Sequence, residues 1–441
     1  MIKDRNTAIF YPAAVCNLNC RYCSIDKNPA LVEIDKILAE SFDGDYYLNF
    51  TKEIFPDPNQ LHRVETWGGE PTLGWHRMYR LMHDLIRHYP NLCEFFSSSN
   101  MVQPKFLDEL IGMLRVFGEF HPRKFKFVLQ MSLDGTEEIT DYNRGNGVTK
   151  RLRATFEKMV QDLAFIVPDN VDFECYFKAT LNADCVRVLQ TKESIVAYYR
   201  FFEGFYDAFY KLNKCSHAKI FPTLPNMATP AQHTVEEGKL FANMCRICKE
   251  IEKDSNHFKY FTEITPYNSN CANSVGSIAC DGFTCGTCRS VIGFLPNDMI
   301  SGCHAAFVDL ISDYKKRITE NSYGSKVLDP GVFTNNPNNF FCFHKDRLAE
   351  REAQVEHYYR QDTTARLVTL KVIIQALAYA GQIDDEFMED EKALQAADLM
   401  YRNASNCMND NLGATGSITT PSTSLIRLLL NGAYKYISVK E

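Results

Sequence analysis

Short apolar runs alternate with amphipathic segments from residue 8 to about residue 221. In the amphipathic segments, apolar residues recur every three or four positions, the period of a helix packed on one side. Repeated strand–helix units of this kind predict a parallel sheet with right-handed crossovers. The predicted strands are 8–12, 63–69, 93–99, 125–133, 172–181 and 218–221, and the predicted helices are 74–89, 106–114, 151–166 and 185–213.

Five or six such units predict an α/β fold, a partial (β/α)6 barrel of the TIM type over residues 1–222. A proline-rich linker and a short helix at 235–252 follow, and then an irregular stretch rich in Asn, Gly, Cys and Ser. Helical periodicity returns at residue 347, with a helix predicted at 363–381, and a last apolar helix is predicted at 425–437. We therefore expect three regions, with bounds at 1–222, 223–346 and 347–441.

Composition and charge exclude several classes of protein. Hydrophobic residues make up 45% and charged residues 23% of the 441 positions, which excludes a disordered chain. The net charge of −7 argues against a dedicated duplex nucleic-acid binder, which needs a basic surface. No apolar run approaches the ~20 residues of a membrane span, and the first residues lack a signal-peptide core. We expect a cytoplasmic protein with neither a nucleic-acid nor a membrane partner.

The 16 cysteines change this picture because they are bunched along the chain. In a reducing compartment, clustered cysteines indicate metal or redox chemistry rather than disulfides. Cys16, Cys20 and Cys23 follow the first predicted strand. Three thiolates on one short loop can hold an iron–sulfur cube by three corners and leave the fourth iron open to a ligand. The alternative is a zinc knuckle, which needs a fourth Cys or His close by, and the nearest histidine is His62.

A Gly-Gly-Glu-Pro motif follows the second predicted strand. Taken alone it indicates a tight strand-to-helix turn, but with the CxxxCxxC motif before it, the order of motifs resembles the radical S-adenosylmethionine (SAM) superfamily. In that family the Cys motif, with an aromatic residue before its last Cys, binds a [4Fe–4S] cluster. The glycines let the backbone approach the methionine part of SAM, and carbonyls and a carboxylate hold its ammonium. The residues implied here are Tyr22, Gly68, Gly69, Glu70 and Pro71.

Two further stretches extend the resemblance. The sequence SSSN (97–100) ends the third strand, where the family often has a turn near the ribose, which implies a role for Ser99. The segment SLDGTEEITDYNRG (132–145) is similar to the SPASM/twitch subgroup of anaerobic sulfatase-maturating enzymes and peptide maturases. It implies that Ser132 bonds SAM hydroxyls and that Arg144 pairs with the SAM carboxylate. The alternative for Arg144 is an ion pair with Asp141. Thr140 stands where the subgroup usually has His.

A second group of cysteines resembles the auxiliary-cluster region of the same subgroup. We expect a hairpin with strands at 290–295 and 299–303, turning at 296–298. The resemblance implies at least one auxiliary [4Fe–4S] cluster, and a zinc site built from four of the cysteines is the alternative. The candidate ligands are Cys271, Cys280, Cys285, Cys288, Cys303 and Cys342.

The other cysteines and the aromatic helix have plainer interpretations. Cys245 and Cys248 lie on one face of a predicted helix, and burial in the core is favoured over a ligand pair. The aromatic residues of 195–212 are interpreted as core packing rather than as a radical relay. The remaining cysteines are expected to be structural: Cys93, Cys175, Cys185, Cys215 and Cys407.

The resemblance implies an oxidoreductase that cleaves SAM reductively and abstracts hydrogen from a peptide or protein side chain, giving oxidation or a crosslink. Its site is expected at the carboxyl-terminal mouth of the barrel strands, with an electron supplied by a partner such as flavodoxin or ferredoxin. The first alternative is a radical SAM dehydrogenase or rearranging enzyme that acts on a small molecule. The second is a non-catalytic metal-binding protein.

Overall fold

The structure is a computed structural model, and it describes residues 5–23, 42–227, 235–254, 256–265, 290–296, 298–302, 318–320, 326–328 and 342–353, with isolated residues 32, 35, 36 and 39. The strands are β1 Thr7–Ala13, β2 Arg63–Gly68, β3 Glu94–Ser99, β4 Phe125–Ser132, β5 Val171–Lys178, β6 Thr180–Leu181, β7 Ala218–Phe221, β8 Asn226–Met227, β9 Val291–Phe294, β10 Met299–Ser301, β11 Ile318–Glu320, β12 Lys326–Leu328 and β13 Cys342–His344. The helices are α2 Gly44–Ile54, η1 Pro71–Leu73, α3 Trp75–His88, α4 Phe106–Gly118, α5 Glu137–Arg144, α6 Val148–Ile166, α7 Ala183–Val188, α8 Lys192–Leu212, α9 Val235–Lys253 and η2 Lys345–Arg347.

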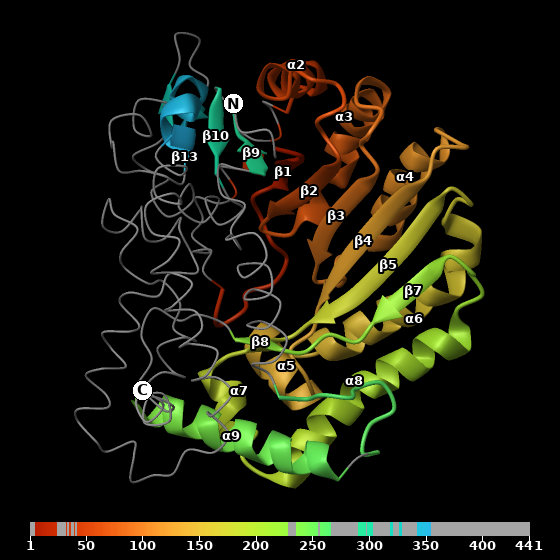
Figure 1. The fold of residues 1–441 in the computed structure, drawn as a ribbon, viewed down its shortest axis with the longest axis vertical. Coiled ribbons are helices and arrows are strands. Elements are labelled where there is room, and N and C mark those ends of the chain that lie inside the picture. The colour runs from red at the N-terminus through yellow and green to blue at the C-terminus, as the bar shows by residue number, and fades with distance from the viewer. Residues whose placement is uncertain are drawn as a thin grey trace, which may run out of the picture.

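A mainly parallel sheet organises the described part of the chain (Figure 1). Its order is β13-β10-β9-β1-β2-β3-β4-β5-β7, and all pairings from β9 to β7 are parallel. The strands from β1 to β5, then β7, are neighbours in space in the order of the sequence, as repeated strand–helix units require. The prediction of an α/β fold with a parallel sheet is confirmed. The three region bounds stay a prediction.

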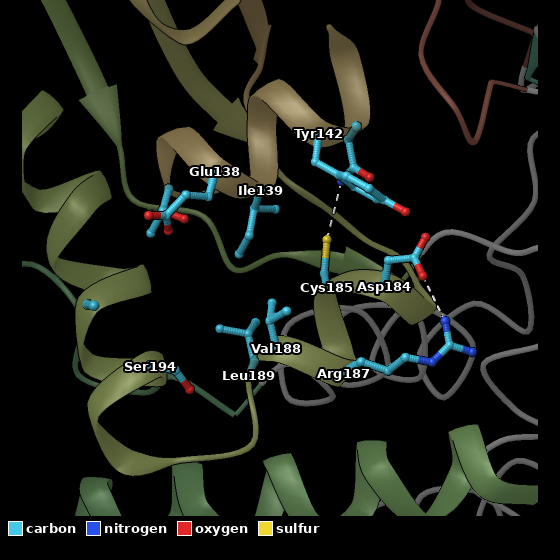
Figure 2. Close-up of a pocket in the computed structure, with 12 residues that line it drawn as sticks. Glu138, Ile139, Tyr142, Asp184, Cys185, Arg187, Val188, Leu189 and Ser194 are labelled. Atoms are coloured by element: carbon cyan, nitrogen blue, oxygen red, sulfur yellow. Dashed lines mark hydrogen bonds and ion pairs between the residues drawn. The ribbon is translucent and has the colours of Figure 1, made fainter. Parts of the chain in front are cut away.

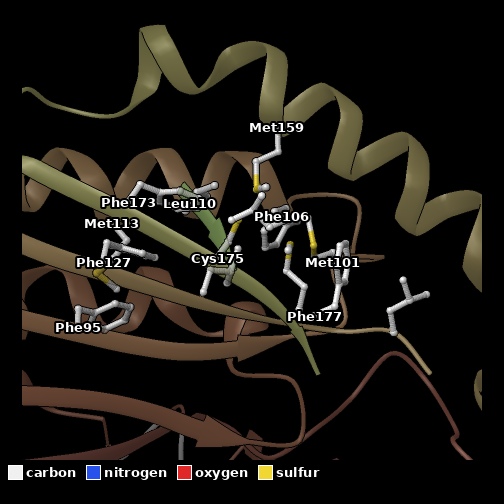
Figure 3. Close-up of a cluster of buried hydrophobic side chains, with 14 of the residues drawn as sticks. Phe95, Met101, Phe106, Leu110, Met113, Phe127, Met159, Phe173, Cys175 and Phe177 are labelled. Carbon is white, nitrogen blue, oxygen red and sulfur yellow. The ribbon is translucent and has the colours of Figure 1, made fainter. Parts of the chain in front are cut away.

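One face of the sheet carries an aromatic core against the helices. Phe95, Phe127 and Phe173 occupy matching positions on β3, β4 and β5, and none of the three is exposed to solvent. The ring centroids lie 4.9 Å apart for Phe95 and Phe127 and 5.7 Å apart for Phe127 and Phe173. Figure 3 shows these rings with Leu110 and Met113 of α4. Burial of this apolar surface supplies most of the driving force for the fold.

The opposite face of the same strands carries most of their polar side chains, because side chains alternate between the two faces of a strand, and it also carries the apolar residues Phe96 and Val128. We call it the polar face, and it includes Gln130 and Ser132 of β4 together with Tyr176 and Lys178 of β5. The side chains of this face interact across the strands: the Tyr176 hydroxyl lies 3.2 Å from Gln130 Oε1. The sheet thus has one apolar face, which packs against the helices, and one face that is mainly polar.

Two predicted elements differ in length from the observed ones. The predicted helix 185–213 is two helices, α7 and α8, because Thr191 and Ser194 form a capping box that starts α8. The predicted strand 172–181 ends at Lys178, and β6 leaves the main sheet to pair with β8. The aromatic residues of α8 are mostly buried in the core, as predicted.

The hairpin predicted near residues 290–303 is confirmed. Its position in the sheet, beside β1, was not predicted from the sequence. β9 and β10 are antiparallel, and β9 lies beside β1, so the hairpin continues the main sheet. A Cβ on Gly293 would lie 2.1 Å from Ser301 Oγ, and the Tyr11 hydroxyl of β1 shares a 2.9 Å hydrogen bond with that oxygen. Glycine therefore permits the close contact of three strands.

The helix predicted at 235–252 is observed as α9, whereas the helices predicted at 363–381 and 425–437 lie outside the described residues. None of the described helices is both long and apolar enough to cross a bilayer.

The aromatic core generates a stability prediction. Phe127→Ala should lower the free energy of unfolding by about 3–5 kcal/mol, because it leaves a cavity between β3, β5 and α4. The matched control is Phe165→Ala, whose side chain is 88% exposed and whose effect should stay within about 0.5 kcal/mol. Urea unfolding of both variants measures the difference, and equal effects would contradict this description of the core.

Candidate functional site

The loop that carries the first three cysteines leaves the carboxyl end of β1. We call residues 14–23 the Cys loop. Cys16, Cys20 and Cys23 are half-buried free thiols. In the described part of the chain, no three His, Cys, Asp or Glu side chains are grouped to hold a single metal ion. The iron–sulfur cube and the zinc knuckle therefore both stay predictions for this loop.

Gly69 is the position where the Cys loop meets the end of β2. A Cβ on Gly69 would lie 2.2 Å from the carbonyl oxygen of Ala14 and 2.4 Å from that of Val15, so only glycine fits. The Gly69 N–H donates to Ala13 and the Glu70 N–H to Val15, at 3.1 and 2.9 Å. The sequence predicted that the glycines let the backbone approach SAM. In the structure, the group that lies against Gly69 is the backbone of the Cys loop.

Glu70 is a buried residue whose hydrogen bonds join the ends of β2 and β3. Its carboxylate is 3% exposed and accepts hydrogen bonds from the N–H and hydroxyl of Thr72 and from the Asn100 N–H. It caps η1, whose first residue is the buried Pro71. Burial raises the pKa of this carboxyl, and the hydrogen bonds oppose the rise. Its predicted contact with an ammonium group stays a prediction.

Asn100, which sequence reasoning did not select, contacts the first cysteine directly. Its Nδ2 lies 3.7 Å from Cys16 Sγ and donates to Asn17 Oδ1 at 2.7 Å, and the Leu18 N–H donates to the same sulfur at 3.4 Å. Donors of this kind stabilise a thiolate and tune a metal centre bound to it. The neighbouring Ser99 is buried and accepts from the Met101 N–H, which fixes the turn. The only hint in the sequence was the position of SSSN at a strand end.

Asp134, in the motif SLDG, is the second residue that the sequence analysis missed. Its carboxylate is fully buried and accepts from the Tyr22 hydroxyl at 2.8 and 3.0 Å and from the Thr180 N–H at 3.1 Å. Arg144 binds both oxygens, through Nε at 2.8 Å and Nη2 at 2.7 Å. Burial raises the pKa of Tyr22. One carboxylate therefore joins the Cys loop, β4, α5 and β6.

Arg144 is buried, and its partner differs from the alternative that its sequence spacing suggested. Burial alone would lower its pKa, but the Asp134 carboxylate raises it above the ordinary value. Asp141 instead accepts from the N–H groups of Gly147 and Thr149, at 2.6 and 2.8 Å, at the start of α6. The proposed Arg144–Asp141 pair is therefore wrong. Contact of Arg144 with a SAM carboxylate stays a prediction.

The Cys loop is also held to α5 by Arg21. Its N–H donates to the carbonyl of Asn143 and its Nε to that of Tyr142, both at 2.8 Å, and its guanidinium lies 4.0 Å from the centre of the Tyr142 ring. Ser132, the last residue of β4, is half-buried beside Lys178 of β5. The structure thus brings all four motifs to the carboxyl ends of β1 to β4, as the sequence predicted for a parallel sheet.

The predicted auxiliary cluster falls largely outside the described residues. Cys342 begins β13, and its side chain is not described. The other candidate ligands lie outside the described ranges: Cys271, Cys280, Cys285, Cys288 and Cys303. On α9, Cys245 and Cys248 are buried in the core, where burial raises the pKa of both thiols. This placement favours the predicted core role for that pair.

A cavity of about 510 Å³ lies between α5, α7 and the start of α8 (Figure 2). Apolar side chains form much of its lining, including Ile139 and Leu189. The Cys185 sulfur at its wall lies 3.3 Å from Asn143 Nδ2, and burial raises the pKa of this thiol to about 11. Cys185 is therefore a protonated thiol at ordinary pH, in agreement with the structural role predicted for it.

Comparisons with known proteins find similarity to solved structures. No family model matches the chain, and no curated protein matches it. Among solved structures, one entitled "Native anSMEcpe with bound AdoMet" covers 98% of this chain and 99% of its own, at 13% identity and a TM-score of 0.47. A similarity at this level establishes neither a shared family nor a shared function.

The close approach at Gly69 predicts that alanine at this position and alanine at an open glycine position change the free energy of unfolding in opposite directions. Gly69→Ala should lower the free energy of unfolding by about 1–3 kcal/mol, because the new methyl overlaps the Cys-loop carbonyls. Gly204→Ala, in open space on α8, should raise it by about 0.5–1 kcal/mol. Denaturant titration of the two variants checks this, and a Gly69→Ala protein as stable as the wild type would refute the steric argument.

The buried ion pair predicts a large effect for a small chemical change. Asp134→Asn should lower the free energy of unfolding by about 3–5 kcal/mol, because Arg144 is left buried without a counter-charge. Asp184→Asn is the matched control, since its pair with Arg187 is half exposed and is worth about 0–1 kcal/mol. Thermal and urea unfolding compare the two. Similar losses in both variants would show that the buried pair has no special role.

Proposed function

We propose that this protein is a radical SAM enzyme, which cleaves SAM reductively to a 5′-deoxyadenosyl radical and abstracts hydrogen from a peptide or protein side chain. The observation that carries the proposal is the meeting of the motifs at one edge of the sheet. The Cys loop rests on Gly69, receives a hydrogen bond from Asn100, and is tied to Asp134 through Tyr22. These contacts join four motifs that are far apart in the sequence and that follow one another in the order typical of radical SAM enzymes.

The residues of the Cys loop fit an iron–sulfur cube. Three half-buried thiols, from Cys16, Cys20 and Cys23, lie on one loop, and Cys16 already has two N–H donors directed at its sulfur. When bound, a cube with one open iron would supply the electron that breaks the sulfonium of SAM. Asn100 and Leu18 would stabilise the Cys16 thiolate, and Tyr22 would hold the end of the loop against Asp134.

The finer parts of the proposal rest on the resemblance of SLDG…Arg and of the second cysteine group to the SPASM/twitch subgroup. These parts are the peptide substrate, at least one auxiliary [4Fe–4S] cluster and a flavodoxin or ferredoxin as reductant. The polar face of the sheet supports a ligand bound at its carboxyl-terminal edge, because Asp134, just after β4, links Tyr22 of the Cys loop to Thr180 of β6. Parallel sheets bind ligands at that edge.

The test is anaerobic reconstitution followed by iron counting and product analysis. Wild-type protein with a chemical reductant and SAM should yield 5′-deoxyadenosine and methionine. The variant Cys16→Ala/Cys20→Ala/Cys23→Ala should lose all cleavage and about four irons per chain, the content of one cube. The iron that remains in this variant measures the auxiliary clusters, near four for one and near eight for two.

Cys93→Ala is the matched control for that variant, because Cys93 is an exposed thiol away from the Cys loop, and it should keep both iron and cleavage. Cleavage that persists without the three loop cysteines would refute the proposed function.

A further inference from the structure

Lys178 is a lysine of the polar face without a partner in the described part of the chain. It ends β5, and strand alternation places it opposite the buried Cys175 and Phe177. Its neighbour across the sheet is Ser132, the last residue of β4. It therefore stands at the carboxyl-terminal edge of the sheet, on the face away from the aromatic core.

Several other charged residues of this face form ion pairs. Lys126 Nζ lies 2.7 Å from Glu174 Oε2, near the opposite ends of the same two strands. Arg63 forms ion pairs with Glu65 and Glu94. Among the described residues, no carboxylate comes within ion-pair distance of Lys178, and no charged group acts on it strongly enough to offset its burial. Burial lowers the pKa of its ammonium for this reason.

An unpaired ammonium in a partly dehydrated position is costly, because the charge loses water without gaining a counter-ion. Proteins keep such groups chiefly where a ligand completes the pair or where the amine reacts. Around Lys178 the neutral polar groups of Ser132, Gln130 and Tyr176 offer hydrogen bonds but no negative charge. The missing component is an anion with hydrogen-bond acceptors.

We propose that Lys178 binds the carboxylate of a ligand that enters the polar face of the barrel. The identity of the ligand rests on the proposed function, which leaves two sources for this one group. The carboxylate belongs either to SAM or to an acidic side chain of the peptide substrate. A carboxylate fits because it accepts from an ammonium and from adjacent hydroxyls at the same time.

Competitive acetylation of the whole protein by acetic anhydride tests the proposal, with mass spectrometry of each lysine. Only the neutral amine reacts, so Lys178 should become reactive at a lower pH than Lys126, the matched control on the same face. A bound carboxylate should slow acetylation of Lys178 by about tenfold, which corresponds to one pKa unit, and leave Lys126 unchanged.

Paired probes identify the source of the carboxylate. SAM is compared with decarboxylated SAM, and the end-blocked peptide Gly-Ser-Asp-Ser-Gly with its Asn counterpart. Protection by SAM alone, or by the Asp peptide alone, supports the proposal and names the source. Protection by neither carboxylate probe overturns it, as does equal protection by decarboxylated SAM or by the Asn peptide.

Variants provide a second measurement. Lys178→Gln should weaken binding of the protecting probe in calorimetry by about tenfold, Lys178→Arg should restore much of it, and Lys126→Gln should have no effect. The melting temperature of each variant controls for folding. Production of 5′-deoxyadenosine by the wild type is assayed separately, so failure of the lysine proposal is distinguishable from failure of the proposed function.

Discussion

The buried carboxylate of Asp134 is the contact on which the position of the Cys loop depends. It has no solvent access, and its negative charge is balanced by Arg144 and by the Tyr22 hydroxyl. A carboxylate in this environment is tolerated only when its partners are well placed. The loop, α5 and β6 are therefore fixed together, and movement of one of them breaks charge-assisted hydrogen bonds in the others.

The two faces of the sheet have different roles, because one packs into the core and the other carries polar groups near the candidate site. On the helix side, packed aromatic residues such as Phe127 fill the core. On the polar face, some side chains pair across strands, as Lys126 and Glu174 do, whereas Lys178 has no charged partner in the part of the chain that the structure describes. Because both faces belong to the same strands, the core that stabilises the sheet also positions the groups at its carboxyl-terminal edge.

Motif residues were recognisable in the sequence, but several of their contacts were not. Gly69 was identified as a glycine that permits close approach, and the structure shows that its neighbour is the Cys loop. Glu70 was identified as a carboxylate of the site, and in the structure it is buried and accepts a hydrogen bond from the Asn100 N–H. For Arg144 the sequence offered a SAM carboxylate or Asp141 as partner, and in the structure Arg144 pairs with Asp134 rather than with Asp141. The sequence could not show which groups these side chains meet in space.

The sequence alone determined the strand–helix order, the parallel sheet, the β9–β10 hairpin and the placement of four motifs at strand ends. These follow from local periodicity and turn chemistry, which act within a few residues. Only the tertiary structure decided that β9 joins β1, that Asn100 meets Cys16, and that Lys178 has no counter-ion among the described residues. Such contacts join residues far apart in the chain, and their geometry depends on how the strands twist and pack, which no local pattern encodes.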